Sequence, residues 1–240
     1  MEVKVLSYTK DPEITCAIAM RSTRTKEAAH SLQYPSMPKC RPEELGEYEG
    51  CRAKALSKGV DWGPGWIQCR YDKQCAERML MEAKDRKHWG VFEHATFTVS
   101  VEGVSRACTH QLVRHRQNSF LQQSQRAVEI DTSKGDWYVV PPTFKDGIRV
   151  GFSTFMHGCG AAYRQAIEAG IPEEDARYVL PNACKTNIVI TANARQWLHI
   201  FYMRLSPAAQ WEIREMAQKI LEELMNISPA IFEGAGKLEV

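Results

Sequence analysis

The sequence predicts an α+β fold, a single domain over residues 1–240 with a small antiparallel or mixed sheet and several helices. Two short β-rich segments, Val3–Tyr8 and Ala95–Val101, alternate apolar with polar side chains as half-buried strands do. From Gly151 onward the spacing of the apolar residues is mainly helical. No internal repeat, low-complexity tract or evident linker divides the sequence, so one domain is the simplest prediction.

The first half of the chain is predicted to run from a strand through an irregular stretch to a helix and a second strand. After Val3–Tyr8, prolines and glycines make residues 24–70 irregular. Gln74–Lys87 has helical spacing, with these residues on or near one face: Cys75, Met79 and Met81–Ala83. The second strand is Ala95–Val101, and we expect Gly103 to end it.

The second half is predicted to be mainly helical, with helices over Val104–His115, 151–169, a few residues after Pro172, and 207–225. Residues 114–126 should leave the first of these helices as a loop, because they include poor interior helix formers such as Asn118 and Ser119. Asp136–Val140 is expected to form a short strand before two prolines. Thr186–Thr191 is apolar and β-branched but lies between helical segments, so both states stay open.

Composition limits the classes of function. With 44% hydrophobic and 25% charged residues, the chain has the composition of an ordinary globular protein. Its net charge of +2 is too small for a general nucleic-acid coat, so any anion must be bound locally. Neither an apolar run of about 20 residues nor a signal-peptide pattern is present, which predicts a cytoplasmic protein without a membrane partner. The 8 cysteines include no C-x-x-C pair, so reduced thiols are expected.

The segment RHRQNSFLQQSQR, residues 114–126, is the strongest candidate for a binding site. Arg114, His115 and Arg116 place up to three like charges side by side, which is unfavourable unless an anion lies among them. Arginine presents a planar fork of donors that suits phosphate and carbonyl groups. An isolated R-H-R is more often only a favourable helix C-terminus. The added Ser124 and Arg126 weaken that alternative, and nucleic acid, a cofactor phosphate and water are all possible occupants.

A second group of polar residues follows at Asn193, Arg195, His199 and Arg204. If residues 194–204 form a helix, Asn193 occupies the N-cap position, and Arg195 and His199 share a face one turn apart. A capped helix that carries two surface cations is an equally good interpretation of this pattern.

The remaining sequence features give no independent sign of a binding site. Arg177 lies in an apolar helical context, where an arginine more often pairs with a carboxylate such as Glu174. His88, Glu93 and His94 have a spacing that fits no common set of metal ligands, so no metal is predicted. Neither a dinucleotide-binding G-x-G-x-x-G after a strand nor a phosphate-binding P-loop occurs.

Taken together, these segments resemble the flavin-dependent thymidylate synthases, whose signature is R-H-R, seven residues and serine. Arg114-His115-Arg116 and Ser124 match this signature. Other similar segments run in order from about residue 88 to 216, namely FEH, SRACTHQLVRHR, SQR, ARYVLPN, NAR and AQWEIRE. The resemblance of the N-terminal third is looser.

The resemblance implies a catalytic domain that methylates dUMP reductively to dTMP. Methylenetetrahydrofolate would supply the carbon, FAD would carry the hydride, and NADPH would reduce the flavin. The resemblance also implies a homotetramer whose active sites are shared between chains, with FAD held in the family's own fold at the subunit interfaces.

Carried over residue by residue, the resemblance implies two sets of contacts. We call the residues that would contact FAD the flavin set: His88, Arg114, His115, Arg116, Gln122, Asn193, Arg195 and His199. We call those that would bind the nucleotide, some from a neighbouring chain, the nucleotide set: Gln111, Arg114, Gln122, Gln123, Ser124, Gln125, Arg126, Arg177 and Arg204. Arg204 matches the family's catalytic arginine, which would stabilise ionised uracil N3 and so make C5 more nucleophilic.

Several positions depart from the usual family pattern. Ala127 stands where many relatives carry an aromatic residue, Gly90 where several carry serine or threonine, and Gln122 where some carry glutamate. We hypothesise that Ala127, together with Phe120 and Leu121, alters the nucleotide loop. A larger pocket would admit UMP or another pyrimidine nucleotide, with methylation or hydroxymethylation at C5. A nucleic-acid-binding module is the alternative from another class, and the modest charge argues against it.

Overall fold

The computed structural model of the chain describes residues 1–23 and 73–240, so the expectation for residues 24–70 lies outside the described part. The elements follow in this order: β1 (Glu2–Tyr8), α1 (Pro12–Ser22), α3 (Lys73–Asp85), the 3-10 helix η3 (Trp89–His94), β2 (Thr96–Ser105), α4 (Arg106–Leu112), β3 (Ser119–Gln122), α5 (Asp146–Glu168), α6 (Glu173–Ala176), the 3-10 helix η4 (Arg177–Val179), β4 (Lys185–Asn193), α7 (Ala194–Arg204), α8 (Trp211–Ile227) and α9 (Pro229–Phe232).

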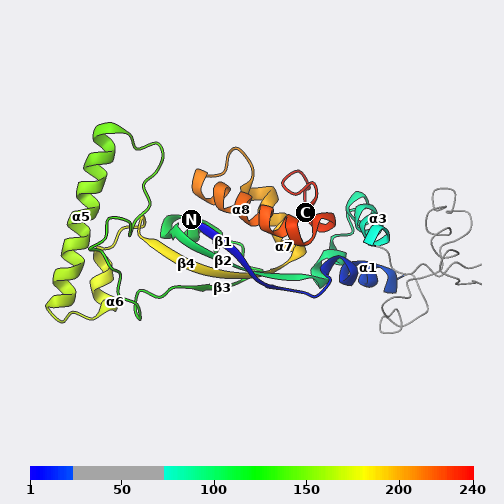
Figure 1. Ribbon diagram of the computed structural model, residues 1–240, viewed down its shortest axis with the longest axis horizontal. Coiled ribbons are helices and arrows are strands. Elements are labelled where there is room, and N and C mark those ends of the chain that lie inside the picture. The colour runs from blue at the N-terminus through cyan, green and yellow to red at the C-terminus, as the bar shows by residue number, and fades with distance from the viewer. Residues whose placement is uncertain (24–72) are drawn as a thin grey trace, which may run out of the picture.

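A four-stranded antiparallel sheet with the order β1-β2-β4-β3 connects the two ends of the molecule (Figure 1). Phe97, Val99 and Val101 of β2 are buried, as their alternation predicts. Helices α7 and α8 lie over one face of the sheet, α1 and α3 at one end, and α5 and α6 at the other (Figure 1). The predicted α+β fold is therefore confirmed, with a sheet that is antiparallel throughout the described residues.

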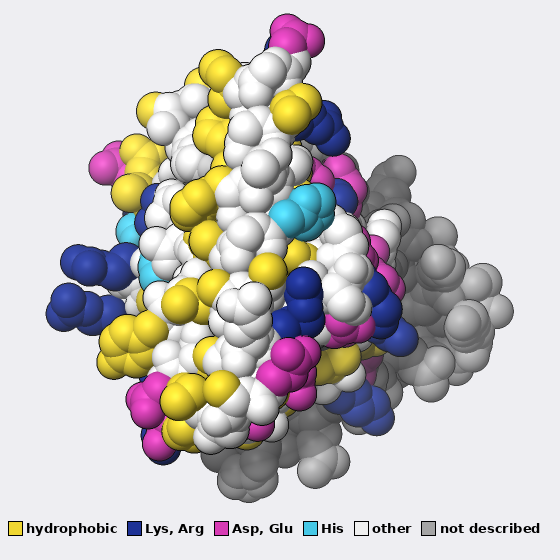
Figure 2. Space-filling model, turned by 90° about the vertical axis from the view of Figure 1, so that its left-hand side faces the viewer, with side chains coloured by type: hydrophobic (Ala, Val, Ile, Leu, Met, Phe, Trp, Pro, Cys, Tyr) yellow, Lys and Arg dark blue, Asp and Glu magenta, His cyan; other side chains and the backbone are white. Residues whose placement is uncertain are grey.

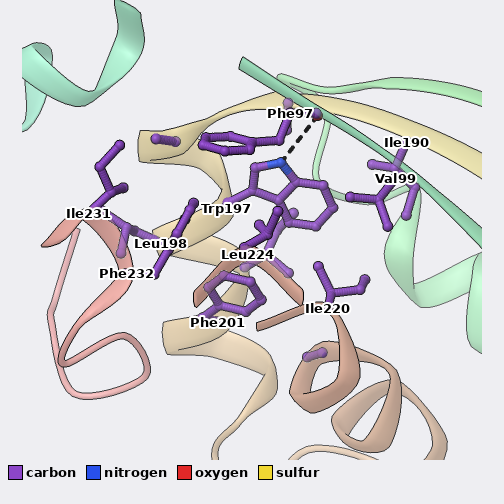
Figure 3. Close-up of a cluster of buried hydrophobic side chains, with 14 of the residues drawn as sticks. Phe97, Val99, Ile190, Trp197, Leu198, Phe201, Ile220, Leu224, Ile231 and Phe232 are labelled. Carbon is purple, nitrogen blue, oxygen red and sulfur yellow. Dashed lines mark hydrogen bonds between the residues drawn. The ribbon is translucent and has the colours of Figure 1, made fainter. Parts of the chain in front are cut away.

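The main core lies between the sheet and the C-terminal helices (Figure 3). Trp197 of α7 is fully buried, and its indole N–H donates to the carbonyl oxygen of Phe97 at 3.4 Å. Phe232 packs edge-on against Phe97 and Phe201, with ring centroids 5.2 and 5.9 Å apart. These contacts fix α7 against β2, so the residues at the N-terminus of α7 take a defined position above the sheet.

A smaller core lies at the end of the sheet where α5 stands (Figure 1). Its buried residues are Trp137, Tyr138, Met156 and Cys184. Tyr138 and Cys184 form a single β-bridge. The prediction of a strand over Asp136–Val140 is wrong, because this bridge is the segment's only strand-like pairing.

The junction of β2 and α4 differs from the sequence prediction. Gly103 does not end the strand, which continues to Ser105 after a shift of register between Val101 and Val104. Gly103 has a φ of +71° and donates its N–H to Asn187 Oδ1 at 3.1 Å, as a glycine in a β-bulge can. The helix predicted over Val104–His115 therefore spans only Arg106–Leu112, capped by the Ser105 side chain.

The loop predicted over residues 114–126 is wrong in its centre. Ser119–Gln122 forms the edge strand β3, which pairs with β4 from Ser119 opposite Thr191 to Gln122 opposite Ile188. This pairing settles the open assignment of Thr186–Thr191 in favour of a strand. Phe120 packs against the main core, which explains why this polar segment becomes ordered as a strand.

The remaining elements follow the predictions with shifted ends. The strand at Val3–Tyr8 and the helices after Pro172, over 194–204 and over 207–225 are confirmed. The helix predicted over 151–169 begins earlier, at Asp146, and α3 ends at Asp85. Among the side chains of α3 that are described, Ala76, Leu80 and Ala83 are buried and Met81 is 54% exposed, so Met81 was assigned to the wrong face. The side chain of Cys75 lies outside the described part. Helix α1 was not predicted.

Candidate functional site

A cavity of about 700 Å³ lies where the N-terminus of α7 meets the segment after α4. It is lined by Glu93, Arg114, His115, Arg116, Gln117, Asn193, Arg195, Gln196, His199 and Val240. Most of the flavin set therefore comes together from two distant parts of the sequence, while His88 and Gln122 are not among the lining residues. A volume of this size is within the range of small-molecule and cofactor sites.

The N-terminus of α7 positions one wall of the cavity. Asn193 has extended backbone angles, and its side-chain oxygen accepts the N–H of Gln196 at 2.9 Å, which confirms the predicted N-cap. Arg195 and His199 lie one turn apart on α7 and both line the cavity, as their spacing predicts. The buried Trp197 between them holds α7 on the sheet, so these side chains belong to a rigid element.

The segment after α4 forms the opposite wall. His115 donates its N–H to the carbonyl oxygen of Leu112 at 3.1 Å, so it lies in a turn and not on the helix. The helix predicted to reach His115 therefore ends at Leu112, and His115 does not share a helical face with Gln111. Gln196 Nε2 donates to Gln117 Oε1 at 2.5 Å and ties the two walls together.

The lining of the cavity carries an excess of positive charge. Arg195 pairs with Glu93, with Nη1 and Oε1 2.6 Å apart. Arg114 and Arg116 are exposed, and neither forms an ion pair with any described residue. The N-terminus of α7 adds the positive end of its dipole. Three guanidinium groups and a helix N-terminus outweigh the Glu93 carboxylate and the Val240 oxygen, which lies 3.3 Å from His199 Nδ1, and make a site suited to a ligand with phosphate groups.

His115 connects this cavity to Arg204, the last residue of α7. Arg204 Nε donates to His115 Nε2 at 3.0 Å, and Arg204 Nη2 donates to the main-chain oxygen of Gln111 at 3.4 Å. The rings of His115 and His199 meet edge to face, with centroids 5.8 Å apart. Burial, then the charge of Arg204, then His199, lowers the pKa of His115 to about 4. His115 is therefore neutral at neutral pH.

A second cluster of polar residues lies near the other end of β4. Gln123 donates its N–H to the Asn187 carbonyl oxygen at 2.9 Å, and the chain then leaves the sheet toward α6. Arg126 pairs with Glu174, with distances of 2.8 Å from Nε and 2.6 Å from Nη2 to the same carboxylate oxygen. Arg177 donates from Nε to the main-chain oxygen of Glu174 at 3.0 Å, and not to its carboxylate as predicted.

These two groups are well separated in one chain. Between Asn187 and Asn193, β4 rises roughly 20 Å at about 3.3 Å per residue. The cavity lies at the Asn193 end, and the Arg126–Glu174–Arg177 cluster lies beyond the Asn187 end. One chain therefore does not bring the flavin set and these members of the nucleotide set into a single pocket.

The other predicted residues have different surroundings. His88 is exposed at the start of η3. Gln122 Nε2 donates to Thr186 Oγ1 at 3.2 Å, and Gln111 Nε2 lies 3.5 Å from the Ala107 carbonyl oxygen. Gln125 is buried and directs Nε2 toward Cys184 Sγ at 3.6 Å, which places its side chain in the smaller core. Ser124 is exposed, and its Oγ accepts the N–H of Arg126 at 3.1 Å.

Several residues near the site were missed from the sequence. Glu93 was considered only as a metal ligand, and the described residues contain no group of three His, Cys, Asp or Glu that could hold a metal. Arg106 Nη2 donates to the Gln123 carbonyl oxygen at 2.9 Å, which supports the chain just before Ser124. Glu212 is buried and accepts from Ser105 N at 2.7 Å and Ser105 Oγ at 2.5 Å. No local sequence signal indicates these contacts, because the partners come from distant segments.

The positions that depart from the family pattern are mostly on the surface. A Cβ atom at Gly90 would meet nothing within 4 Å, so a side chain there has space. Ala127 is exposed, Leu121 is 79% exposed, and neither lines the cavity.

None of the helices in residues 1–23 and 73–240 is sufficiently long and apolar to span a bilayer.

Comparison with known proteins gives a consistent result. Residues 4–230 match the family model described as thymidylate synthase complementing protein. The flavin-dependent thymidylate synthase of Geobacter sulfurreducens is 47% identical over 153 residues, which cover 62% of this chain and 65%, just under two thirds, of that relative. The corresponding protein of Sulfolobus acidocaldarius is 34% identical over 241 residues, covering 98% and 77%. That of Haloarcula marismortui is 31% identical over 258 residues, covering 97% and 94%.

Proposed function

Because the chain belongs to the thymidylate synthase complementing protein family, whose relatives compared above are named flavin-dependent thymidylate synthases, we propose that it converts dUMP to dTMP by reductive methylation. Methylenetetrahydrofolate is the proposed carbon donor and NADPH the proposed reductant. The observation that carries this proposal is the cationic cavity formed by Arg114, His115, Arg116, Arg195 and His199.

The cavity is the proposed FAD site. Its donors fit a ligand with a pyrophosphate, since Arg114, Arg116 and Arg195 surround the N-terminus of α7. Asn193, already fixed as the N-cap, and the side chains of Gln117 and Gln196 add neutral hydrogen-bonding groups. These residues would hold FAD, which would supply a carrier of hydride between NADPH and the one-carbon unit.

Arg204 is the proposed catalytic residue. Its guanidinium would stabilise negative charge on uracil N3 and the adjacent carbonyl oxygen, which raises the electron density at C5. Ser124, Arg126 and Arg177 would bind the nucleotide, with Gln111 and Gln123. Glu174 accepts from Arg126 Nε and Nη2 in the free chain, so a bound phosphate would compete with this carboxylate for two of the five N–H donors of the guanidinium.

We further propose a homotetramer in which neighbouring chains complete each site. The separation of roughly 20 Å between Asn187 and Asn193 of β4 supports this arrangement. Helix α5 also presents apolar side chains to solvent (Figure 2), with Ile148 66% exposed, Val150 67% exposed and Phe155 59% exposed. Such a patch on a 23-residue helix is suited to contact with another copy of the chain.

The reaction is tested by incubating the purified protein with FAD, NADPH, methylenetetrahydrofolate and dUMP and identifying the nucleotide product by chromatography. We expect a yellow protein, NADPH oxidation that is faster with dUMP than without it, and dTMP as the product. A protein that takes up no FAD, or forms no dTMP, contradicts the proposal. A parallel reaction with UMP tests the effect of Ala127: turnover of UMP would indicate a wider nucleotide specificity.

Sharing of sites between chains is tested by mixing two inactive variants, Arg195→Ala and Arg126→Ala. If each site takes Arg195 from one chain and Arg126 from another, mixed oligomers contain some intact sites and recover activity. The matched control mixes Arg195→Ala with Arg116→Ala, which alter the same cavity and should not complement. Equal activity in both mixtures, or none in either, contradicts the shared arrangement.

A further inference from the structure

Arg204 differs in its partners from Arg195 and Arg126, the two site arginines that form ion pairs. Arg195 pairs with Glu93 at 2.6 Å, and Arg126 pairs with Glu174 at 2.6 Å. Arg204 is instead held by two acceptors without charge, His115 Nε2 at 3.0 Å and the Gln111 carbonyl oxygen at 3.4 Å. Across residues 1–23 and 73–240, no carboxylate lies within ion-pair distance of Arg204.

The nature of these partners matters for what Arg204 can do. A carboxylate partner would orient the guanidinium but also offset most of its charge, whereas a neutral acceptor orients it and leaves the charge for a ligand. We propose that His115 is a positioning residue: as a neutral acceptor at Nε2, it holds Arg204 in place with its full charge directed to an anionic ligand. That the ligand is an ionised pyrimidine rests on the function proposed above.

The location of His115 allows this role. Its main-chain N–H is fixed to Leu112, at the end of α4, and Arg204 is the last residue of α7. The Arg204–His115 contact thus joins two elements that meet at the cavity. Because His115 also lines the cavity, the same ring contacts both the proposed flavin site and the arginine of the proposed nucleotide site.

The surroundings of His115 keep it in the form that this role requires. Arg204 and His199 contact His115 directly, and Arg114, Arg116 and Arg195 lie around the cavity. The acceptors at the cavity have other partners, since Glu93 is paired with Arg195 and the Val240 oxygen lies 3.3 Å from His199 Nδ1. The pKa of His115 is accordingly lowered, with burial as the largest cause. For Nε2 to accept a hydrogen bond, the single ring proton must lie on Nδ1.

The first test is nitrogen-15 NMR of the histidine side chains in the full chain, without and with FAD. We expect His115 to be neutral with its proton on Nδ1 from about pH 5 upward, and Arg204→Met to raise its pKa toward the ordinary value of about 6.5. Comparison with His115→Gln assigns the signal. A charged ring at pH 6, or a proton on Nε2, overturns the proposal. This measurement needs no turnover, so it decides the role of His115 even if the proposed reaction is wrong.

The second test compares two replacements at His115 under conditions where FAD binding has been measured and saturated. His115→Gln keeps an acceptor oxygen without charge, while His115→Lys places a charged donor opposite Arg204. We expect kcat/KM for dUMP to stay within about tenfold of wild type for the glutamine variant and to fall roughly 100-fold for the lysine variant. Equal losses of kcat/KM in the two variants would mean that a hydrogen bond accepted by residue 115 does not position Arg204, and the proposal would be overturned.

Discussion

The two ends of β4 carry candidate binding residues of different kinds. At the Asn193 end, the main core holds α7 rigidly and the walls of the cavity are tied together within one chain. At the other end, a smaller core supports an open arginine cluster, where the Arg126 side chain is 65% exposed compared with 38% for Arg195. The residues that line the cavity thus come together within one chain, and the exposure of the cluster around Arg126 supports the proposal that another chain completes its site.

The largest effect is expected in the main core, which should affect FAD binding as well as stability, whereas the smaller core should affect stability alone. Trp197→Ala removes the largest side chain that α7 buries against the sheet. We expect it to lower the free energy of unfolding by about 3–5 kcal/mol and to weaken FAD binding. Trp137→Ala, in the smaller core, is the matched control. It should also destabilise the protein but leave FAD affinity unchanged in the folded state. Urea unfolding and FAD titration check both variants, and an equal loss of FAD binding would contradict the separation.

A second prediction concerns the support of α4. Glu212→Gln is nearly isosteric but loses the charged acceptor for Ser105 N and Oγ, so we expect a loss of about 2–3 kcal/mol in the free energy of unfolding. Glu215→Gln on the same helix is the control, since Glu215 forms only a partly exposed pair with Lys219 and should lose about 0.5 kcal/mol or less. Similar losses in the two variants, measured by denaturant unfolding, would show that the buried contact contributes little.

The free energy of unfolding should also depend on pH through His115 at the cavity end. The folded chain holds the pKa of His115 at about 4, below the ordinary histidine value of 6.5. Between these values the unfolded chain binds more protons than the folded one, so stability falls as the pH falls through this window. His115→Gln should remove this part of the pH dependence. Urea unfolding of both proteins from pH 7.5 to 4.5 measures it, and parallel curves for the two proteins would contradict the assignment.

The smallest effects are expected at the surface ion pairs. Glu174→Gln and Glu93→Gln break pairs whose side chains are partly exposed, so each should change the free energy of unfolding by less than about 1 kcal/mol. The two variants should differ in binding, with Glu174→Gln freeing Arg126 and lowering the KM for dUMP. A KM that rises or does not change would indicate that Glu174 supports nucleotide binding and does not compete with it.

The sequence predicts the cavity end better than the rest of the molecule. The N-cap at Asn193 and the one-turn spacing of Arg195 and His199 are local features, and the structure confirms both. The strand at Ser119–Gln122 could not be predicted, because its order comes from pairing with β4, about seventy residues away along the chain. Gly103 was taken as a strand end for the same reason, since the bulge depends on the side chain of Asn187.

The same limit applies to partners of charged groups. Sequence proximity suggested an Arg177–Glu174 ion pair, whereas the Glu174 carboxylate binds Arg126. The contact between Arg204 and His115 joins residues 89 positions apart and leaves no local pattern. Long-range contacts of this kind decide which arginines keep an unpaired charge and which share their charge with a carboxylate.

The most direct test of the account is a titration of the wild-type protein, Arg195→Ala and Arg126→Ala with FAD, in which flavin fluorescence reports binding. We predict that Arg195→Ala raises the dissociation constant of FAD by about 10- to 100-fold, because it removes a guanidinium from the cavity. Arg126→Ala, at the far end of β4, should leave the dissociation constant within about twofold of wild type. Equal losses in the two variants, or a loss only in Arg126→Ala, would contradict the assignment of the cavity as the flavin site.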